Sequence, residues 1–112
     1  MFNREKMLAA LRWLHQNPDK HVGGVLAQTA EGLSCSTRSP RADCFCVLGR
    51  YAHECGIDTR EMSMEAFQLT EADEPLYDRL WKKNDMLVKV SPHPAIPLGD
   101  LFWLLPEEIA EG

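Results

Sequence analysis

The sequence predicts a small α+β fold of three or four short helices with a small antiparallel hairpin or sheet. Three observations predict it. Leucine and methionine recur at helical spacing near the N-terminus, glycine and proline interrupt the later pattern at short intervals, and 45% of the 112 residues are hydrophobic against 26% charged. These proportions are typical of a globular protein, and the length fits a single domain over residues 1–112.

Residues 4–16 form the first predicted helix. Its apolar side chains recur at the spacing that places them on one helical face, and Asn3 stands where a capping side chain is expected. Pro18 ends the pattern because proline disfavours helical geometry in the residue before it. The apolar face consists of Met7, Leu8, Leu11 and Leu14.

A short hairpin is predicted next. Glu31 and Gly32 are placed as a turn between residues 25–27 and residues 33–35. We therefore expect these two stretches to pair as antiparallel strands.

The second predicted helix covers about residues 41–55. Residues 39–40 supply a serine for the N-cap and a proline for the first helical position. Gly56 and Ile57 resemble a left-handed C-terminal cap with its apolar contact. Gly49 lies inside the helix, where glycine costs about 1 kcal/mol relative to alanine. It therefore indicates close approach by another element.

The third predicted helix begins at a capping box. Residues 70–73 read Thr-Glu-Ala-Asp, and paired apolar residues follow over residues 76–81. We expect this helix to end near Asn84. Residues 62–69 allow a further short helix, and residues 86–90 a short strand.

Charge and hydropathy favour a protein partner in the cytoplasm. The 12 basic and 17 acidic side chains give a net charge of -5, which opposes direct binding to nucleic acid or to an anionic membrane. No apolar stretch approaches the roughly 20 residues of a membrane span, and the N-terminus lacks the apolar core of a signal peptide. The expected partner is another protein or a second copy of the chain.

The cysteines raise an alternative, a thiol- or metal-dependent site around Cys44 and Cys46. Both stand near the start of the predicted second helix, whose dipole would lower a thiol pKa. They are about 200 degrees apart on a helix, and the chain has no Cys-x2-Cys knuckle. We therefore expect no metal, no cofactor and no disulfide, and cysteines that pack as small apolar residues.

The remaining polar residues do not form a recognisable catalytic motif. Gly23 and Gly24 match neither a phosphate-binding loop nor a dinucleotide fingerprint, and fit a turn. The carboxylates near the third helix fit its solvated, dipole-favoured first turn. The expectation is a protein that is not an enzyme. These carboxylates are Glu71, Asp73, Glu74 and Asp78.

The apolar run over residues 101–105 is the predicted partner-binding site. A helix or strand of this composition is apolar on all sides, so one side needs covering beyond the domain. The alternative is that the whole run belongs to the core. The predicted contact residues are Phe102, Trp103 and Leu105.

Residues 10–86 resemble small uncharacterised domains of bacteriophages and bacteria. Those domains share a glycine-bearing strand, a Cys-hydrophobic-x-Gly helix start and a later Asn-Asp. The resemblance implies a phage-encoded accessory protein in the host cytoplasm that inhibits a host protein or defence system by surface binding. The matching residues are Gly23 or Gly24, Cys46, Leu48, Gly49, Asn84 and Asp85.

Overall fold

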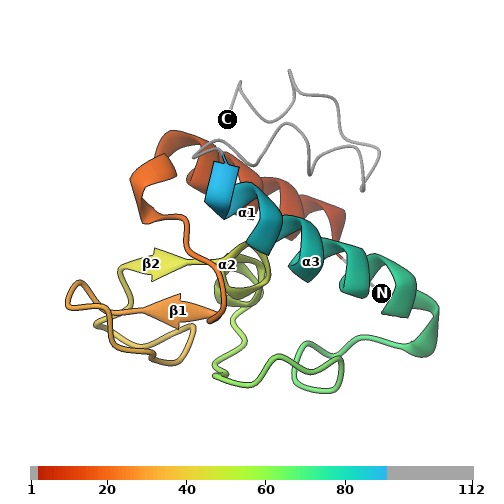
Figure 1. Cartoon of the computed structure of the whole chain (residues 1–112). Coiled ribbons are helices and arrows are strands. Elements are labelled where there is room, and N and C mark those ends of the chain that lie inside the picture. The colour runs from red at the N-terminus through yellow and green to blue at the C-terminus, as the bar shows by residue number, and fades with distance from the viewer. Residues whose placement is uncertain (1–2, 91–112) are drawn as a thin grey trace.

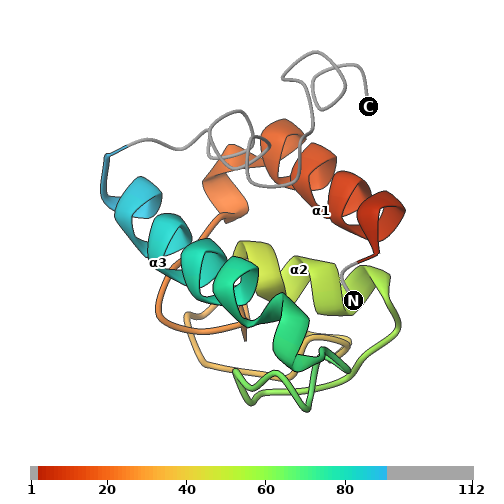
Figure 2. The same ribbon diagram turned by 90° about the vertical axis from the view of Figure 1, so that its right-hand side faces the viewer.

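A computed structural model describes residues 3–90, with side chains described over residues 3–82. Within this part, three α-helices and a two-stranded antiparallel sheet form an α+β fold, as predicted (Figure 1). Helix α2 lies between α1 and α3 (Figure 2). The α-helices are α1 (Arg4–Gln16), α2 (Val47–Glu54) and α3 (Glu74–Val90), the strands are β1 (Ala27–Gln28) and β2 (Cys44–Phe45), and short 3-10 helices cover Pro18–Lys20 and Glu71–Asp73.

Helix α1 confirms the first predicted helix and its cap. The Asn3 side chain accepts a hydrogen bond from the Lys6 amide at 3.1 Å, which satisfies one of the free N–H groups of the first turn. At the other end, the Asn17 side chain donates to the Trp13 carbonyl. The fully buried residues of α1 are Met7, Ala10, Leu11 and Leu14.

The predicted hairpin is correct only in part. Its turn is present, since the Thr29 amide donates to the Leu33 carbonyl at 2.8 Å, and one bridge joins Gln28 to Ser34. However, the strand partner of β1 is β2, with Gln28 opposite Cys44. The sheet therefore joins residues 16 and 18 positions apart, in addition to the local turn.

The predicted start of the second helix is wrong. Residues 44–45 form β2, and α2 begins only at Val47. Strand pairing satisfies the backbone here, because the Asp43 amide donates to the Gln28 carbonyl at 2.8 Å and the Cys46 amide to the Leu26 carbonyl at 3.2 Å. Cys46 is the N-cap in place of the predicted Ser39.

Two predictions for the remainder of α2 are confirmed. Gly56 has a φ of +76°, and the Ile57 amide donates to the Ala52 carbonyl in a Schellman-type cap. A Cβ at Gly49 would lie 1.8 Å from the Leu26 carbonyl oxygen. Glycine at this position therefore allows α2 to pack directly against the backbone that leads into β1.

The chain between α2 and α3 is irregular. Residues 64–68 form a turn in place of the short helix that the sequence allows, and Gln68 has a φ of +59°. The capping box is confirmed, since the Asp73 carboxylate accepts hydrogen bonds from the Thr70 amide at 3.0 Å and the Thr70 hydroxyl at 3.2 Å.

Helix α3 is longer than predicted. It continues to Val90, through the expected end at Asn84 and through residues 86–90, which were expected as a strand. No glycine or proline occurs over residues 76–91, so nothing in the backbone chemistry ends the helix earlier.

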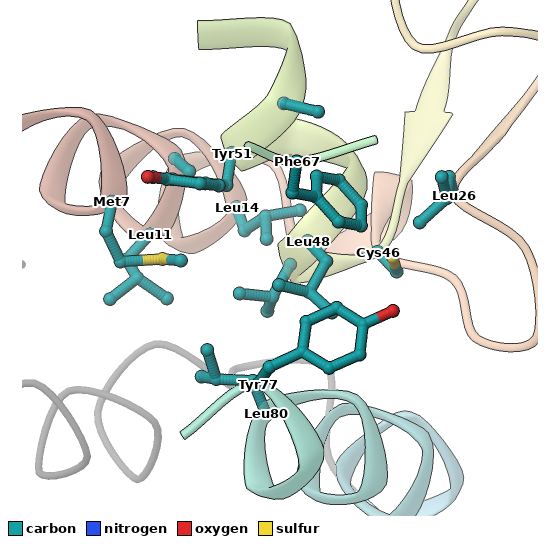
Figure 3. Close-up of a cluster of buried hydrophobic side chains, with 13 residues drawn as sticks. Met7, Leu11, Leu14, Leu26, Cys46, Leu48, Tyr51, Phe67, Tyr77 and Leu80 are labelled. Carbon is teal, nitrogen blue, oxygen red and sulfur yellow. The ribbon is translucent and has the colours of Figure 1, made fainter. Parts of the chain in front are cut away.

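The core lies where α2 faces α1 and α3 (Figure 3). Leu48 is 1% exposed and Leu80 is fully buried, so the central helix and α3 share the same apolar interior. Phe67 adds a side chain from the irregular segment, with its ring centroid 5.9 Å from that of Tyr77. The buried cluster comprises Met7, Ala10, Leu11, Leu14, Leu26, Cys46, Val47, Leu48, Tyr51, Ala52, Phe67, Tyr77 and Leu80.

Candidate functional site

The predicted partner-binding residues lie outside the part of the chain that the structure describes. These are Phe102, Trp103 and Leu105. Asn84 and Asp85, from the bacteriophage-type pattern, lie within α3, beyond the described side chains.

The other residues of that pattern have structural positions. Gly24 has a φ of +80°, a conformation that side-chain-bearing residues rarely adopt. Cys46 caps α2, Leu48 lies in the core, and Gly49 contacts the Leu26 carbonyl. Packing and backbone geometry therefore account for these four residues without a ligand.

Cys44 and Cys46 have separate environments. The Cys46 side chain is buried, and its Sγ accepts a hydrogen bond from the Gly49 amide at 3.2 Å. Cys44 is half-buried in β2, and its thiol donates to the neighbouring Asp43 carboxylate at 3.7 Å. All four cysteines are free thiols in the structure. Within residues 3–90, no group of three or more His, Cys, Asp or Glu side chains is arranged to hold a metal ion.

The surroundings of Cys44 keep its thiol protonated. Burial is the main cause that raises the pKa of Cys44, and the Asp43 carboxylate raises it further. Asp43 is itself held ionised by Lys20, whose ammonium donates to it at 2.7 Å and lowers its pKa. Because only the thiolate is strongly nucleophilic, this arrangement opposes the reactivity expected from the helix dipole.

A second polar cluster surrounds Arg50 on α2. Its guanidinium lies 4.1 Å from the Trp13 ring centroid and donates to Glu54 from Nε at 3.2 Å and from a terminal nitrogen at 3.0 Å. The Arg50 side chain is 14% exposed, and burial lowers its pKa. Trp13 also meets Phe45 edge to face, with centroids 5.5 Å apart. The cluster joins α1, α2 and β2.

The Arg50 cluster was not predictable from the sequence. Arg50 and Trp13 are 37 positions apart, and neither belongs to a motif. Only the pairing of Arg50 with Glu54, four residues later, has a local signal. Since its donors and ring contacts lie within the fold, the cluster stabilises packing, and its geometry does not indicate a ligand.

Residues 58–78 form what we call the acidic segment. In Figure 1 it is the green stretch that leads from the end of α2 into the start of α3. It holds seven carboxylates and one guanidinium, a net charge of -6, whereas residues 3–57 hold seven basic and five acidic side chains. A charge count by segment, rather than over the whole chain, would have found this contrast from the sequence.

The acidic segment also carries one of the two exposed large apolar side chains among the described residues, the other being Leu33. Met62 is 40% exposed, between the exposed residues Glu61 and Glu65. Methionine is flexible and polarizable, and is used at protein-binding surfaces. Met62 therefore provides one flexible apolar contact, with the exposed residues Glu61 and Glu65 near it in the sequence.

Comparisons with known proteins give no relative for this chain. Neither the protein-family models nor the curated proteins nor the solved structures gave a match. Among the described residues, no helix combines the length and apolar character that crossing a bilayer requires.

Proposed function

We propose that the protein is a non-enzymatic interaction protein whose acidic segment binds a basic surface of another protein. The observation that carries the proposal is the segregation of charge. The net charge of -6 on residues 58–78 exceeds that of the entire chain, which is -5. Complementary charge speeds encounter and selects among partners, so a segment rich in charge of one sign favours a partner of the opposite sign.

Local structure supports the same proposal. The carboxylates of Glu61 and Glu65 are on exposed residues of an irregular stretch, and Met62 between them is partly exposed. Binding residues occur disproportionately on such stretches, held in place by a rigid scaffold. Phe67 and Tyr77 supply that scaffold by joining the segment to the core.

The acidic segment favours a different protein over a second copy of this chain. Two copies meeting through this segment would bring carboxylates against carboxylates, and such like-charge contacts disfavour association. The resemblance to small phage and bacterial domains extends the proposal. A phage-encoded protein of this kind acts in the host cytoplasm and inhibits a host protein or defence system by surface binding.

Two double variants with matched charge test the proposal. Glu61→Gln with Glu65→Gln neutralises two exposed carboxylates of the acidic segment. Asp19→Asn with Glu31→Gln neutralises two exposed carboxylates elsewhere, so both proteins carry a net charge of -3. Each is immobilised beside the unchanged protein and exposed to a bacterial lysate, and retained proteins are quantified by mass spectrometry over a salt series.

The expected result is a basic bacterial protein that the unchanged chain and the Asp19/Glu31 variant retain alike. The Glu61/Glu65 variant should retain it several-fold less, and added salt should release it, because salt screens exposed charges. Equal retention by all three proteins would contradict the proposal, as would an acidic partner whose retention does not depend on salt. Met62→Ser should weaken retention without changing net charge.

A further inference from the structure

No further inference is drawn: the strongest candidate, the buried Tyr77 hydroxyl on the side of α3 that faces Cys46 at the start of α2 (Figure 3), is enclosed by core side chains, and nothing within residues 3–90 shows what would bind it.

Discussion

Residues 3–57 and the acidic segment are stabilised in different ways. The first region contains two α-helices and both strands, and two of its acidic side chains form ion pairs, Asp43 with Lys20 and Glu54 with Arg50. The acidic segment makes one turn and a capping box before α3 begins, and contributes few side chains to the core, chiefly Phe67 and Tyr77. Its sequence holds seven carboxylates and a single guanidinium, that of Arg60.

This difference assigns the stability of the fold mainly to residues 3–57 and the proposed binding of a partner to the acidic segment. Apolar burial and backbone hydrogen bonds hold the first region, so substitutions there should affect folding. The second region carries most of its charge on exposed side chains, so neutralising exposed carboxylates such as Glu61 and Glu65 should affect binding and leave folding nearly unchanged.

Leu48→Ala should have the largest effect on stability. Leu48 is 1% exposed, and truncation loses its apolar burial and leaves a cavity between the helices, at a cost of about 2–5 kcal/mol in the free energy of unfolding. Leu33→Ala is the matched control, because Leu33 is 66% exposed, and it should change stability by less than about 0.5 kcal/mol. Urea denaturation of both variants measures the difference. Similar midpoints for the two variants would show that the core is misplaced.

Gly49→Ala should cause the second-largest loss of stability. The new Cβ would meet the Leu26 carbonyl oxygen, a backbone atom that cannot rotate away, so the chain leading into β1 must shift. We expect a loss of about 2–3 kcal/mol, typical of overpacking, although alanine is the better helix former.

Gly24→Ala separates this clash from the general cost of replacing a glycine. Gly24 has a positive φ, but a Cβ there meets nothing within 4 Å, so only backbone strain of about 1 kcal/mol is expected. If the two variants lose equal stability by thermal denaturation, the close contact between α2 and Leu26 does not constrain the fold.

The features that the sequence predicts well are those with local signals. The apolar face of α1 repeats at helical spacing from Met7 to Leu14, and Gly56 with Ile57 forms a local C-terminal cap. Gly49 is informative because a glycine inside a helix needs a reason, and the reason found is the Leu26 carbonyl. Neighbours in sequence determine the first two features, whereas Gly49 signals a close approach without showing that the partner is Leu26, 23 positions earlier.

The errors occur where distant residues determine the structure. Cys44 and Phe45 lie in a continuous apolar stretch that fits a helix or a buried strand, and β1, 17 positions earlier, decides between them. The position of Arg50 against Trp13 likewise depends on tertiary packing. The acidic segment was predictable from the charges in the sequence, whereas the exposure of Met62 could be determined only from the structure.

The smallest effect is expected on the pKa of the Cys44 thiol, which depends on the neighbouring charges of Asp43 and Lys20. Asp43→Asn removes the carboxylate that raises the pKa of Cys44 and leaves Lys20 to favour the thiolate. The pKa of Cys44 should fall, so the pH profile of its alkylation should move to lower pH. Peptide mass spectrometry after iodoacetamide treatment follows this one thiol.

Asp19→Asn provides a graded control for that shift. Asp19 is the weakest of the groups that raise the pKa of Cys44, so its neutralisation should move the profile in the same direction by less. An Asp43→Asn protein whose Cys44 profile does not move would show that the thiol does not interact with this carboxylate in solution.

Native-state hydrogen exchange tests the division between the two regions most directly. Amides in the second half of α2, such as those of Tyr51 and Ala52, lie in the buried core and should exchange only through global unfolding. Amides of residues 60–66, in the irregular part of the acidic segment, should exchange orders of magnitude faster through local opening. Equal protection of the two groups, with equal sensitivity to denaturant, would contradict the account.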